Sequence, residues 1–583
     1  MDGTGGTATA ERTAAPSGSE VGTDGHKGVG SRDGESTAAP PPDRTDVAAP
    51  AAPGVALPRR TRRSVLGAVG ASGAAMVAAA CVPQSNEPVA TAPTTPAPVP
   101  WPLDQARTLA SRATFGATKE VVERILAIGS EAWLDEQLAA AQPDAEAMLA
   151  GYQTLGQTNA QNEVQRTTDE GVLFRQLDHA MLLRAVYDQN QLYEVMCDFW
   201  SNHFTIWRSA KYLTHLKTRD DHDVIRPHAL GRFVDMMLAS GKSPAMLVYL
   251  DNYTSNAFSS AGVNENWGRE ILELHTLGII KGEQVYTEAD MRGVAKVMSG
   301  RSIRFNNDAN KHGYAFIQSY HSRDAVSILG GQWSRPARAN GSMGEADGDS
   351  LLAFLARHPS TARYICWKLC RRFVSDDPPM GLVDRLVDIY RANDTAIRPV
   401  LRGLFLSAEF RASGGQKVKR PNEWLYSALR VMRATVDPQP NGHASTRLRE
   451  TQERLGQPIN ERTTPDGYPE TAPEWISSEG LLKRWEMGGR IARNRLTDSG
   501  ATEKVVVDLN ALLPNPVPAT TRDLVVALAD QVFQFPISPA DAASILSALG
   551  VNQTAAATTL TSNANALQAT FGLLCAHPAF QRR

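Results

Sequence analysis

The stretch DQARTLASRATFGATKEVVERILAIGSEAWLDEQLAAA, residues 104–141, shows the pattern that decides the fold. The apolar positions of its first segment recur at helical spacing: Ala106, Leu109, Ala110 and Ala113. Gly116 then predicts a helix end, and Thr118 and Ser130 predict the N-caps of two further helices. The stretch therefore predicts three short helices, each with one apolar face.

The same periodicity continues through the rest of the chain. Residues 177–204 predict one or two long helices with an interruption near 188–190. Other helices are predicted over 228–252 (two helices around a turn), 287–299, 349–357, 359–373, 380–391, 395–407, 421–434, 478–495, 521–533 and 539–549. The best strand candidates, SIRFN and YAFIQSY, predict a small β-hairpin near 301–320. The expected fold is mainly α, a large multi-helical globular domain.

Composition excludes several classes of protein. The 583 residues carry a formal charge of −2, which gives no electrostatic reason to bind nucleic acid. Nothing from Trp101 onward reaches the roughly 18 consecutive apolar residues of a membrane-spanning helix. Cys366 and Cys370, four apart on a predicted helix, are expected to be buried thiols and not a disulfide. No phosphate loop, G-x-S-x-G elbow, C-x-x-C-H or H-E-x-x-H motif occurs.

An export leader is predicted near the N-terminus. Residues 1–57 lack large apolar residues and are expected to be a disordered extension. Within residues 58–81, TRRSVL contains Arg62 and Arg63 and resembles a twin-arginine signal, followed by a weakly apolar run. The run ends in AAAC, where Cys81 fits a lipoprotein processing site, although the same alanines also fit ordinary signal-peptide cleavage.

These features predict a cellular location and a set of partners. The Pro-rich linker 82–100 would hold the folded part away from the membrane. The protein is expected to use the twin-arginine translocase during export and to remain on the outer face of the cytoplasmic membrane through a lipid anchor, or to be secreted. Residues 101–500 are assigned to one helical domain and 501–583 to a C-terminal helical segment. That segment echoes the order of elements in 373–411.

A series of ordered blocks carries a family resemblance. The blocks are RATFGAT (112–118), FWSNHFTI (199–206), VIRPHALGRFVDMML (224–238), SPAMLVYLDN (243–252), NENWGREILELHTLGI (264–279), YTEADMRGVAKVMSG (286–300), ARHPSTARYICWKLCRRFVSDDPP (356–379), KRPNEWLYSALR (419–430) and LGQP with TPDGYP (455–469). Together they resemble the bacterial domain of unknown function 1800 family. The chain departs from the family pattern at Trp267-Gly268, where Tyr-Ala is usual, and around His321.

That resemblance implies an exported, largely helical protein, commonly found near other exported proteins of unknown function. It supplies no catalytic residue and no cofactor. A functional site therefore has to be sought in the residues themselves.

The stretch GVNENWGREILELHTLGII, residues 262–280, is the first candidate. Glu265, Arg269 and Glu273 follow at i, i+4 and i+8 and predict a ladder of alternating charge on one helix face. Surface pairs of this kind contribute only about 0.3–0.5 kcal/mol each. The ladder therefore predicts a structural seam between helices.

Glu270 suggests a different interpretation of the same helix. It falls at the edge of the apolar face, where burial raises the pKa of a carboxyl group unless a cation meets it. His275 would lie about 140° from Glu270 on an unbroken helix, so the two would not ligate one metal. Under this second interpretation Glu270 and Glu273 belong to a functional pocket.

Two other charged stretches leave alternatives open. His203, in EVMCDFWSNHFTIW (194–207), is expected among aromatic core residues; if functional, it would stay neutral and act as a base or ligand. The cluster in RDDHDVIRPHALGRF (219–233) predicts either solvated loop charge or a divalent-ion site.

Two functions follow from these residues. The first is a lipid-anchored cell-envelope protein that binds or assembles with a partner protein, such as another exported protein of unknown function. The second is an envelope enzyme in which Glu270, Glu273 and His203 converge as catalytic groups, with or without a metal.

Overall fold

Capped helices dominate the chain in the computed structural model, which describes residues 104–139, 144–211, 213–339, 343–496 and 504–583. The side chain of Asp104 caps the first helix by accepting from the backbone N–H of Arg107, and Thr118 caps the second in the same way. Thr287 and Asp290 form a reciprocal capping box. The predicted mainly α fold is confirmed.

The N-terminal half consists of helices and one hairpin. Its first elements are α2 (Gln105–Ala113), α3 (Lys119–Ile128), α4 (Ser130–Ala139), η1 (Asp144–Leu149), α5 (Gln153–Gly156), α6 (Asn159–Tyr187), α7 (Gln191–His203), α8 (Thr214–Asp220), η2 (Asp221–Ile225) and α9 (Arg226–His228). They are followed by α10 (Phe233–Ser240), α11 (Pro244–Tyr249), η3 (Asn252–Thr254), α12 (Glu265–Glu270), η4 (Ile271–His275), α13 (Glu288–Met298), β1 (Arg301–Ile303) and β2 (Tyr314–Phe316).

The remaining elements are again mostly helices. They are η5 (Gln318–Tyr320), β3 (Val326–Ile328), η6 (Leu329–Gly331), β4 (Trp333–Arg335), α14 (Gly344–Arg357), α15 (Pro359–Phe373), α16 (Met380–Ala392), α17 (Ile397–Phe405), α18 (Ala408–Arg411), α19 (Pro421–Val431), β5 (Thr435–Val436) and α20 (His443–Leu455). The chain continues through η7 (Ala472–Glu474), α21 (Ser478–Ala492), β6 (Val505–Val506), η8 (Asn510–Leu512), α22 (Thr521–Phe533), α23 (Pro539–Ala548), α24 (Thr558–Thr561), α25 (Ala564–Ala576) and η9 (Pro578–Gln581).

Three small antiparallel pairs of strands interrupt the helices. The predicted hairpin near 301–320 is confirmed as β1 and β2, with Ser302 opposite Ala315. A second hairpin, β3 with β4, pairs Ser327 with Ser334. The third pair joins β5 to β6 from distant parts of the chain, so no turn signal in the sequence announces it.

Three local features differ from the sequence-based expectation. Helix α20 was not predicted, because its sequence HASTRLRETQERL offers few apolar residues. Helix α2 ends at Ala113, and Gly116 is not its cap; a Cβ on Gly116 would lie 2.8 Å from the Cα of Ser427, so close packing requires glycine there. Ser130 is the first residue of α4 and not its cap.

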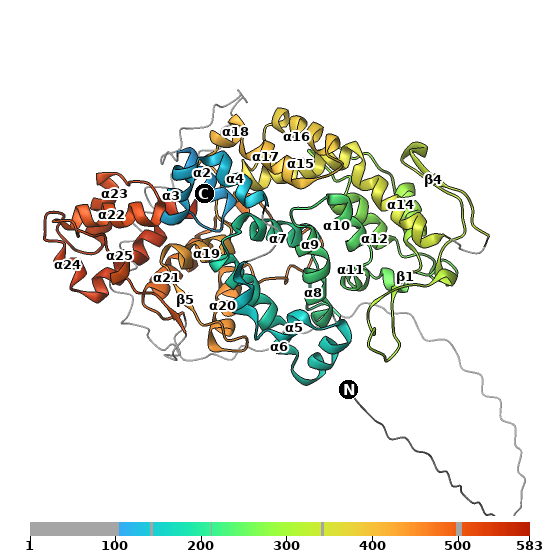
Figure 1. Ribbon diagram of the computed structural model, residues 1–583, viewed down its shortest axis with the longest axis horizontal. Helices are drawn as coiled ribbons and strands as arrows, with labels where there is room; N and C mark the ends of the chain where they lie inside the picture. Colours follow the sequence, from blue (N-terminus) through green and yellow to red (C-terminus); the bar gives the residue numbers. More distant parts are fainter. Residues whose placement is uncertain (1–103, 140–143, 212, 340–342, 497–503) are drawn as a thin grey trace, which may run out of the picture. The chain divides into compact units, whose positions relative to one another are not determined.

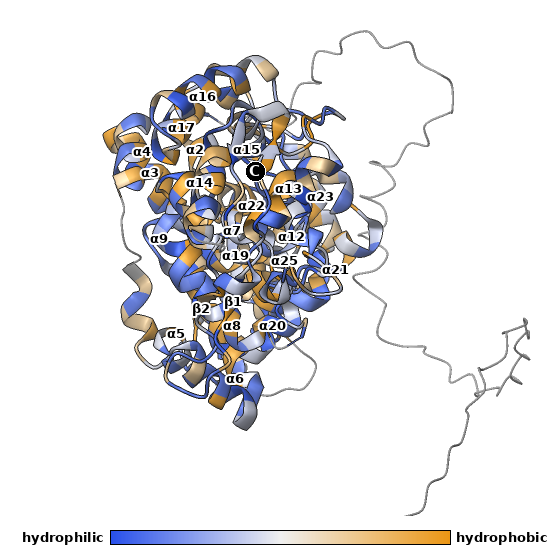
Figure 2. Ribbon diagram, turned by 90° about the vertical axis from the view of Figure 1, so that its right-hand side faces the viewer, coloured by the Kyte–Doolittle hydropathy of each residue, from blue (hydrophilic) through white to orange (hydrophobic). Residues whose placement is uncertain are grey.

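One cluster of buried apolar side chains extends from Ala106 in α2 to Phe580 in η9. Single helices carry both hydrophobic and hydrophilic residues, as Figure 2 shows for the amphipathic elements around this core. Helices α21 and α25, orange and red in Figure 1, approach closely because Gly488 and Gly489 face Gly572 and Cys575. Residues 504–583 thus share the core of the preceding helices.

The thiols and the leader complete this description. Cys366 and Cys370 are free and buried, as predicted. Arg62, Arg63 and Cys81, with the predicted extension, signal and linker, lie outside the described residues. Among the described helices, none has the length and apolar character needed to cross a membrane.

Candidate functional site

A π-turn positions the acidic residues predicted at 262–280. The side chain of Asn264 caps α12, which ends at Glu270 and continues as the π-helical turn η4 (Ile271–His275). Thr276 closes this turn by donating from Oγ1 to the carbonyl of Ile271 over 2.6 Å. π-Turns are rare in proteins as a whole, but those that occur are often found at functional sites. The sequence predicted a continuous α-helix here. The π-turn interrupts that helix at the acidic residues.

Glu270 and Glu273 are half-buried on either side of this junction. Among the residues that the structure describes, neither makes a hydrogen bond or ion pair, and Arg269 makes none either. The predicted ladder of Glu265, Arg269 and Glu273 therefore forms no ion pairs. Burial, and then the charge of Glu273, raise the pKa of Glu270 to about 7, although Arg269 opposes the shift.

Three tyrosine side chains lie close enough to the two carboxylates to be affected by their charges. Tyr286 is 3% exposed and its hydroxyl has no hydrogen-bond partner in the described part of the chain. Burial raises its pKa, and the charge of Glu273 and the neighbouring Tyr364 add to the effect. Tyr249 donates to the carbonyl of Thr463 over 3.0 Å, and burial with the charge of Glu270 raises its pKa to about 12. The charges of the two carboxylates thus act on three tyrosine hydroxyl groups.

A pair formed by the buried His203 and the half-buried Lys368 lies near the ring of Tyr364. The Nζ of Lys368, in α15, lies 2.9 Å from Nδ1 of His203, and 5.4 Å from the ring centre of Tyr364. Nε2 of His203 lies 3.1 Å from the carbonyl oxygen of His275. Burial lowers the pKa of Lys368 to about 8, whereas the charges of Glu470 and Asp466 oppose that shift. Burial, and then the charge of Lys368, hold the pKa of His203 well below its usual value.

Aromatic rings enclose His203, as its sequence context predicts. Its ring centre lies 4.7 Å from that of Phe204 and 5.5 Å from that of Trp200, and its side chain is 2% exposed. His275 is also buried, and both its ring nitrogens lack a hydrogen-bond partner among the described residues. Burial lowers the pKa of His275 to about 3. Both imidazoles are therefore neutral at pH 7.

The loop between α20 and η7 connects the two parts of the site. Asn202 holds it at the end of α7 by donating to the carbonyl of Tyr468 over 2.8 Å and accepting from its N–H over 2.7 Å. A Cβ on Gly467 would lie 2.3 Å from the carbonyl of Asn202, so only glycine fits. The loop brings in Asp466, whose charge acts on Glu270, Tyr249, Tyr364 and Lys368.

A network of buried, ion-paired side chains connects the same loop to α15. Glu423 pairs with Arg372, and lies 3.0 Å from a guanidinium nitrogen of Arg583 and 3.4 Å from one of Arg420. Arg420 also lies 3.1 Å from the carboxylate of Glu470. These cations hold the pKa of Glu423 far below its usual value despite its burial. The network is a rigid support, because its charges are already paired.

The structure brings together only part of the predicted site. Glu270 and Glu273 lie together, but His203 is hydrogen-bonded to Lys368 and His275 and to neither glutamate. Lys368, Tyr286 and Asp466 were missed by reasoning from the sequence. One signal was available for Lys368, because a lysine inside the apolar run YICWKLC is unusual on a buried helix.

The structure also places the predicted Asp/His cluster. Residues 214–228 are helical and not a loop, with a π-turn at Asp221–Ile225. Asp220 is paired with Lys217 over 2.7 Å and accepts from Ser243 over 2.6 Å, whereas Asp223 pairs with Arg219 and His222. Within residues 104–583, apart from the gaps given above, no group of three or more His, Cys, Asp or Glu side chains could hold a metal ion.

Comparisons with known proteins add one finding. The model of the family described as "Protein of unknown function (DUF1800)" matches residues 108–582, which includes the C-terminal segment. No curated protein and no solved structure matches the chain.

Proposed function

This chain belongs to the DUF1800 family of proteins of unknown function, and we propose that it is an exported, lipid-anchored protein that binds a partner through Glu270 and Glu273. Export rests on the leader: Arg62 and Arg63 precede a weakly apolar run, and Cys81 follows it where a lipoprotein thiol is modified. A twin-arginine translocase carries folded cargo, which agrees with a body whose ends share one core.

The unpaired carboxylates carry the proposal of binding. A half-buried carboxylate without a cation or a donor costs free energy, and two such groups on adjacent turns repel each other. Within the described chain, Glu270 and Glu273 form no hydrogen bond and no ion pair, and the charge of Arg269 offsets the raised pKa of Glu270 only in part. A cationic group from a partner would relieve both costs at once, which makes a partner's lysine or arginine the best complement.

The surroundings of the two glutamates favour the same class of ligand. The hydroxyl of Tyr286 is buried and has no hydrogen-bond partner among the residues that the structure describes, and Tyr249 and Tyr364 lie near enough to be affected by the charges of the glutamates. Tyrosine faces attract ammonium and guanidinium groups. Ile279 and Val285, which follow the π-turn, are 38% and 53% exposed and offer apolar contact beside the charges. The arrangement suits a basic segment of another exported protein.

One observation favours a second function, an enzyme. A carboxyl group whose pKa is about 7 can give and take a proton at neutral pH, as a general acid or base does. His203 does not belong to such a mechanism, because its two ring nitrogens are already engaged by Lys368 and His275. The catalytic group under this alternative would be Glu270, with Tyr286 as a donor to the substrate.

Zero-length cross-linking in native membranes tests the binding proposal. A carbodiimide joins a carboxylate directly to a lysine amine that contacts it, so mass spectrometry should find a partner's lysine linked to Glu270 or Glu273. The link should disappear in a Glu270→Gln, Glu273→Gln double variant and persist in Glu265→Gln, a control on the same helix. Absence of any link at 270 or 273, with loss of the cellular phenotype in Glu270→Gln, would contradict binding and favour the enzyme.

Fractionation tests the address separately. Mass spectrometry of the membrane fraction should find a mature chain that begins at a diacylated Cys81. Cys81→Ala should release the protein from the membrane, and Arg62→Lys with Arg63→Lys should leave it in the cytoplasm. An uncut leader on a cytoplasmic wild-type chain would overturn the export proposal.

A further inference from the structure

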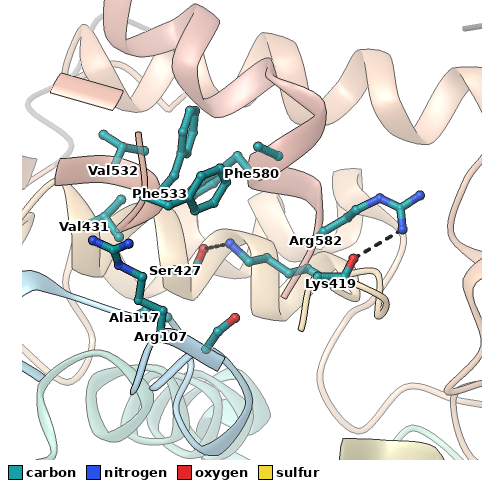
Figure 3. Close-up of a pocket in the computed structure, with 14 residues that line it drawn as sticks. Arg107, Ala117, Lys419, Ser427, Val431, Val532, Phe533, Phe580 and Arg582 are labelled. Carbon is teal, nitrogen blue, oxygen red and sulfur yellow. Dashed lines mark hydrogen bonds between the residues drawn. The ribbon is translucent and has the colours of Figure 1, made fainter. Parts of the chain in front are cut away.

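A pocket lies where α2, α19, α22 and η9 meet, lined by residues far in the sequence from Glu270 and Glu273. Figure 3 shows its centre, in which Lys419 and Ser427 form a hydrogen bond beside the ring of Phe580. The cavity has a volume of about 30 Å³, enough for a group the size of a carboxylate. Its apolar wall consists of Val431, Val532, Phe533, Phe535 and Phe580.

Lys419 is the residue of this pocket whose amine has no ion-pair partner in the described chain. Its side chain is buried, with 8% of the residue exposed, and Nζ lies 2.8 Å from Oγ of Ser427 and 3.9 Å from the ring centre of Phe580. No carboxylate of the described chain forms an ion pair with it. Glu423, which lies close enough to act on its charge, is already shared by Arg372, Arg420 and Arg583. A buried ammonium group without a counter-ion is costly.

The rest of the lining adds positive charge. Arg107 and Arg582 also border the cavity, and no aspartate or glutamate of the described part of the chain does. Arg582 donates to the carbonyl of Gly415 over 3.3 Å and has no acidic partner in the described residues. Arg107 lies 3.6 Å from Asp104 and 3.8 Å from Asp530, at the outer rim. The pocket is therefore cationic inside and apolar along one wall.

We propose that this pocket binds a small organic carboxylate with an apolar body, whose carboxylate supplies the counter-ion of Lys419. One carboxylate oxygen accepts from Nζ of Lys419, and the hydroxyl of Ser427 donates to the other. The apolar body lies on Phe533, Phe535 and Phe580 towards the open side. A phosphate dianion fits less well, because it has no apolar part to cover the wall of Phe533, Phe535 and Phe580. This site is independent of Glu270 and Glu273.

Calorimetric titration of the full-length protein with hexanoate tests the proposal, with hexanol and hexylammonium as probes that lack the negative charge. Hexanoate should bind at one site and raise the melting temperature, and the two other probes should not. Lys419→Met should weaken binding at least tenfold. Lys483→Met, a control that removes an exposed lysine of α21, should leave it unchanged.

A second variant protects the test against loss of folding. Ala117→Leu introduces no charge and fills the rim of the cavity, so it should also abolish hexanoate binding while Lys419 stays in place. Equal binding of hexanoate and hexanol would overturn the proposal, because it would show that the charge is irrelevant. Absence of hexanoate binding to the folded wild type, or undiminished binding to folded Lys419→Met, would overturn it as well.

Discussion

Lys368 fixes the tautomer of His203. Its ammonium donates over 2.9 Å to Nδ1, which must therefore accept, so Nε2 carries the ring proton and donates to the carbonyl of His275 over 3.1 Å. A second proton on His203 would face the lysine directly, and burial opposes it further. The pair links α7 and α15 through a polar contact inside an aromatic cluster. The protonation state of His203 therefore depends on how these helices pack.

The first prediction concerns this tautomer. In protein labelled with ¹⁵N-histidine, His203 should be neutral with the proton on Nε2 at pH 7, because both burial and Lys368 hold its pKa well below the usual value of an imidazole. Its resonances are identified by their loss in His203→Gln. A doubly protonated ring at pH 7 would contradict the assignment. In Lys368→Met the pKa of His203 should rise, since one of the charges that lower it is gone.

The second prediction is an acid-sensitivity caused by His275. Its pKa is lowered to about 3 in the fold, so between pH 6.5 and 3 the unfolded chain binds a proton that the folded chain does not. The stability from this group is present above pH 6.5 and is lost as the pH falls, by up to about 3 kcal/mol at pH 4. His275→Phe should reduce the fall in unfolding free energy between pH 6.5 and 4, measured by urea titration. An unchanged fall would show that His275 finds a partner in solution.

Glu270 should act in the opposite direction. Its pKa is raised to about 7 in the fold, so the folded chain holds a proton that the unfolded chain releases above about pH 4.5. Its favourable contribution is present below pH 4.5 and is lost as the pH rises through 7. Because the group is half-exposed, Glu270→Gln should raise the unfolding free energy at pH 8 by about 1–2 kcal/mol. Glu265→Gln, on the same helix, should change it by less than about 0.5 kcal/mol.

The sequence predicted the positions of these residues on their helices better than it predicted their local geometry and contacts. Periodicity and caps predicted α13 and α15 closely, because their signals are local: Thr287 with Asp290, and Pro359 at the start of an apolar run. Glu270 and Glu273 were found for a similar reason, as charges at the edge of an apolar face. The π-turn after Glu270 was not predicted, since nothing in ILELHT differs from an ordinary helix.

The features of the site that were not predicted depend on contacts between residues far apart in the sequence. Lys368 meets His203 across 165 residues, and Asp466 reaches the glutamates on a loop fixed by Asn202 and Tyr468. Such contacts depend on how helices pack, and helical spacing carries no information on them. The convergence of His203 with the glutamates was inferred from residue type alone, and the structure gives His203 other partners.

The fourth prediction tests the buried ion network. Glu423→Gln should destabilise the protein by about 3–5 kcal/mol at pH 7, because Arg372, Arg420 and Arg583 would then share fewer negative charges. Glu409→Gln is the control: its pair with Arg385 is exposed, and its loss should cost about 0–1 kcal/mol. Denaturant unfolding measures both. Similar costs for the two variants would show that the network contributes no more than a surface pair.

The last prediction concerns Gly278, which lies behind Tyr364. Its φ is +67°, and a Cβ would lie 2.2 Å from the Tyr364 ring, so Gly278→Ala must strain the backbone and displace the ring. Gly282 is a matched control, because its φ is +86° but a Cβ there would meet nothing within 4 Å. Gly282→Ala should cost about 1 kcal/mol from the backbone alone, and Gly278→Ala about 2–4 kcal/mol.

The same pair of variants separates packing from strain at the site itself. Displacing Tyr364 moves a ring that lies near both Lys368 and His203, so Gly278→Ala should also shift the ¹⁵N resonances of His203, which Gly282→Ala should leave in place. Suppose that both variants lost equal stability and left the His203 resonances unchanged. The Tyr364 ring could then move aside without a loss of folding free energy. The close contact at Gly278 would then have no part in holding the histidine–lysine pair.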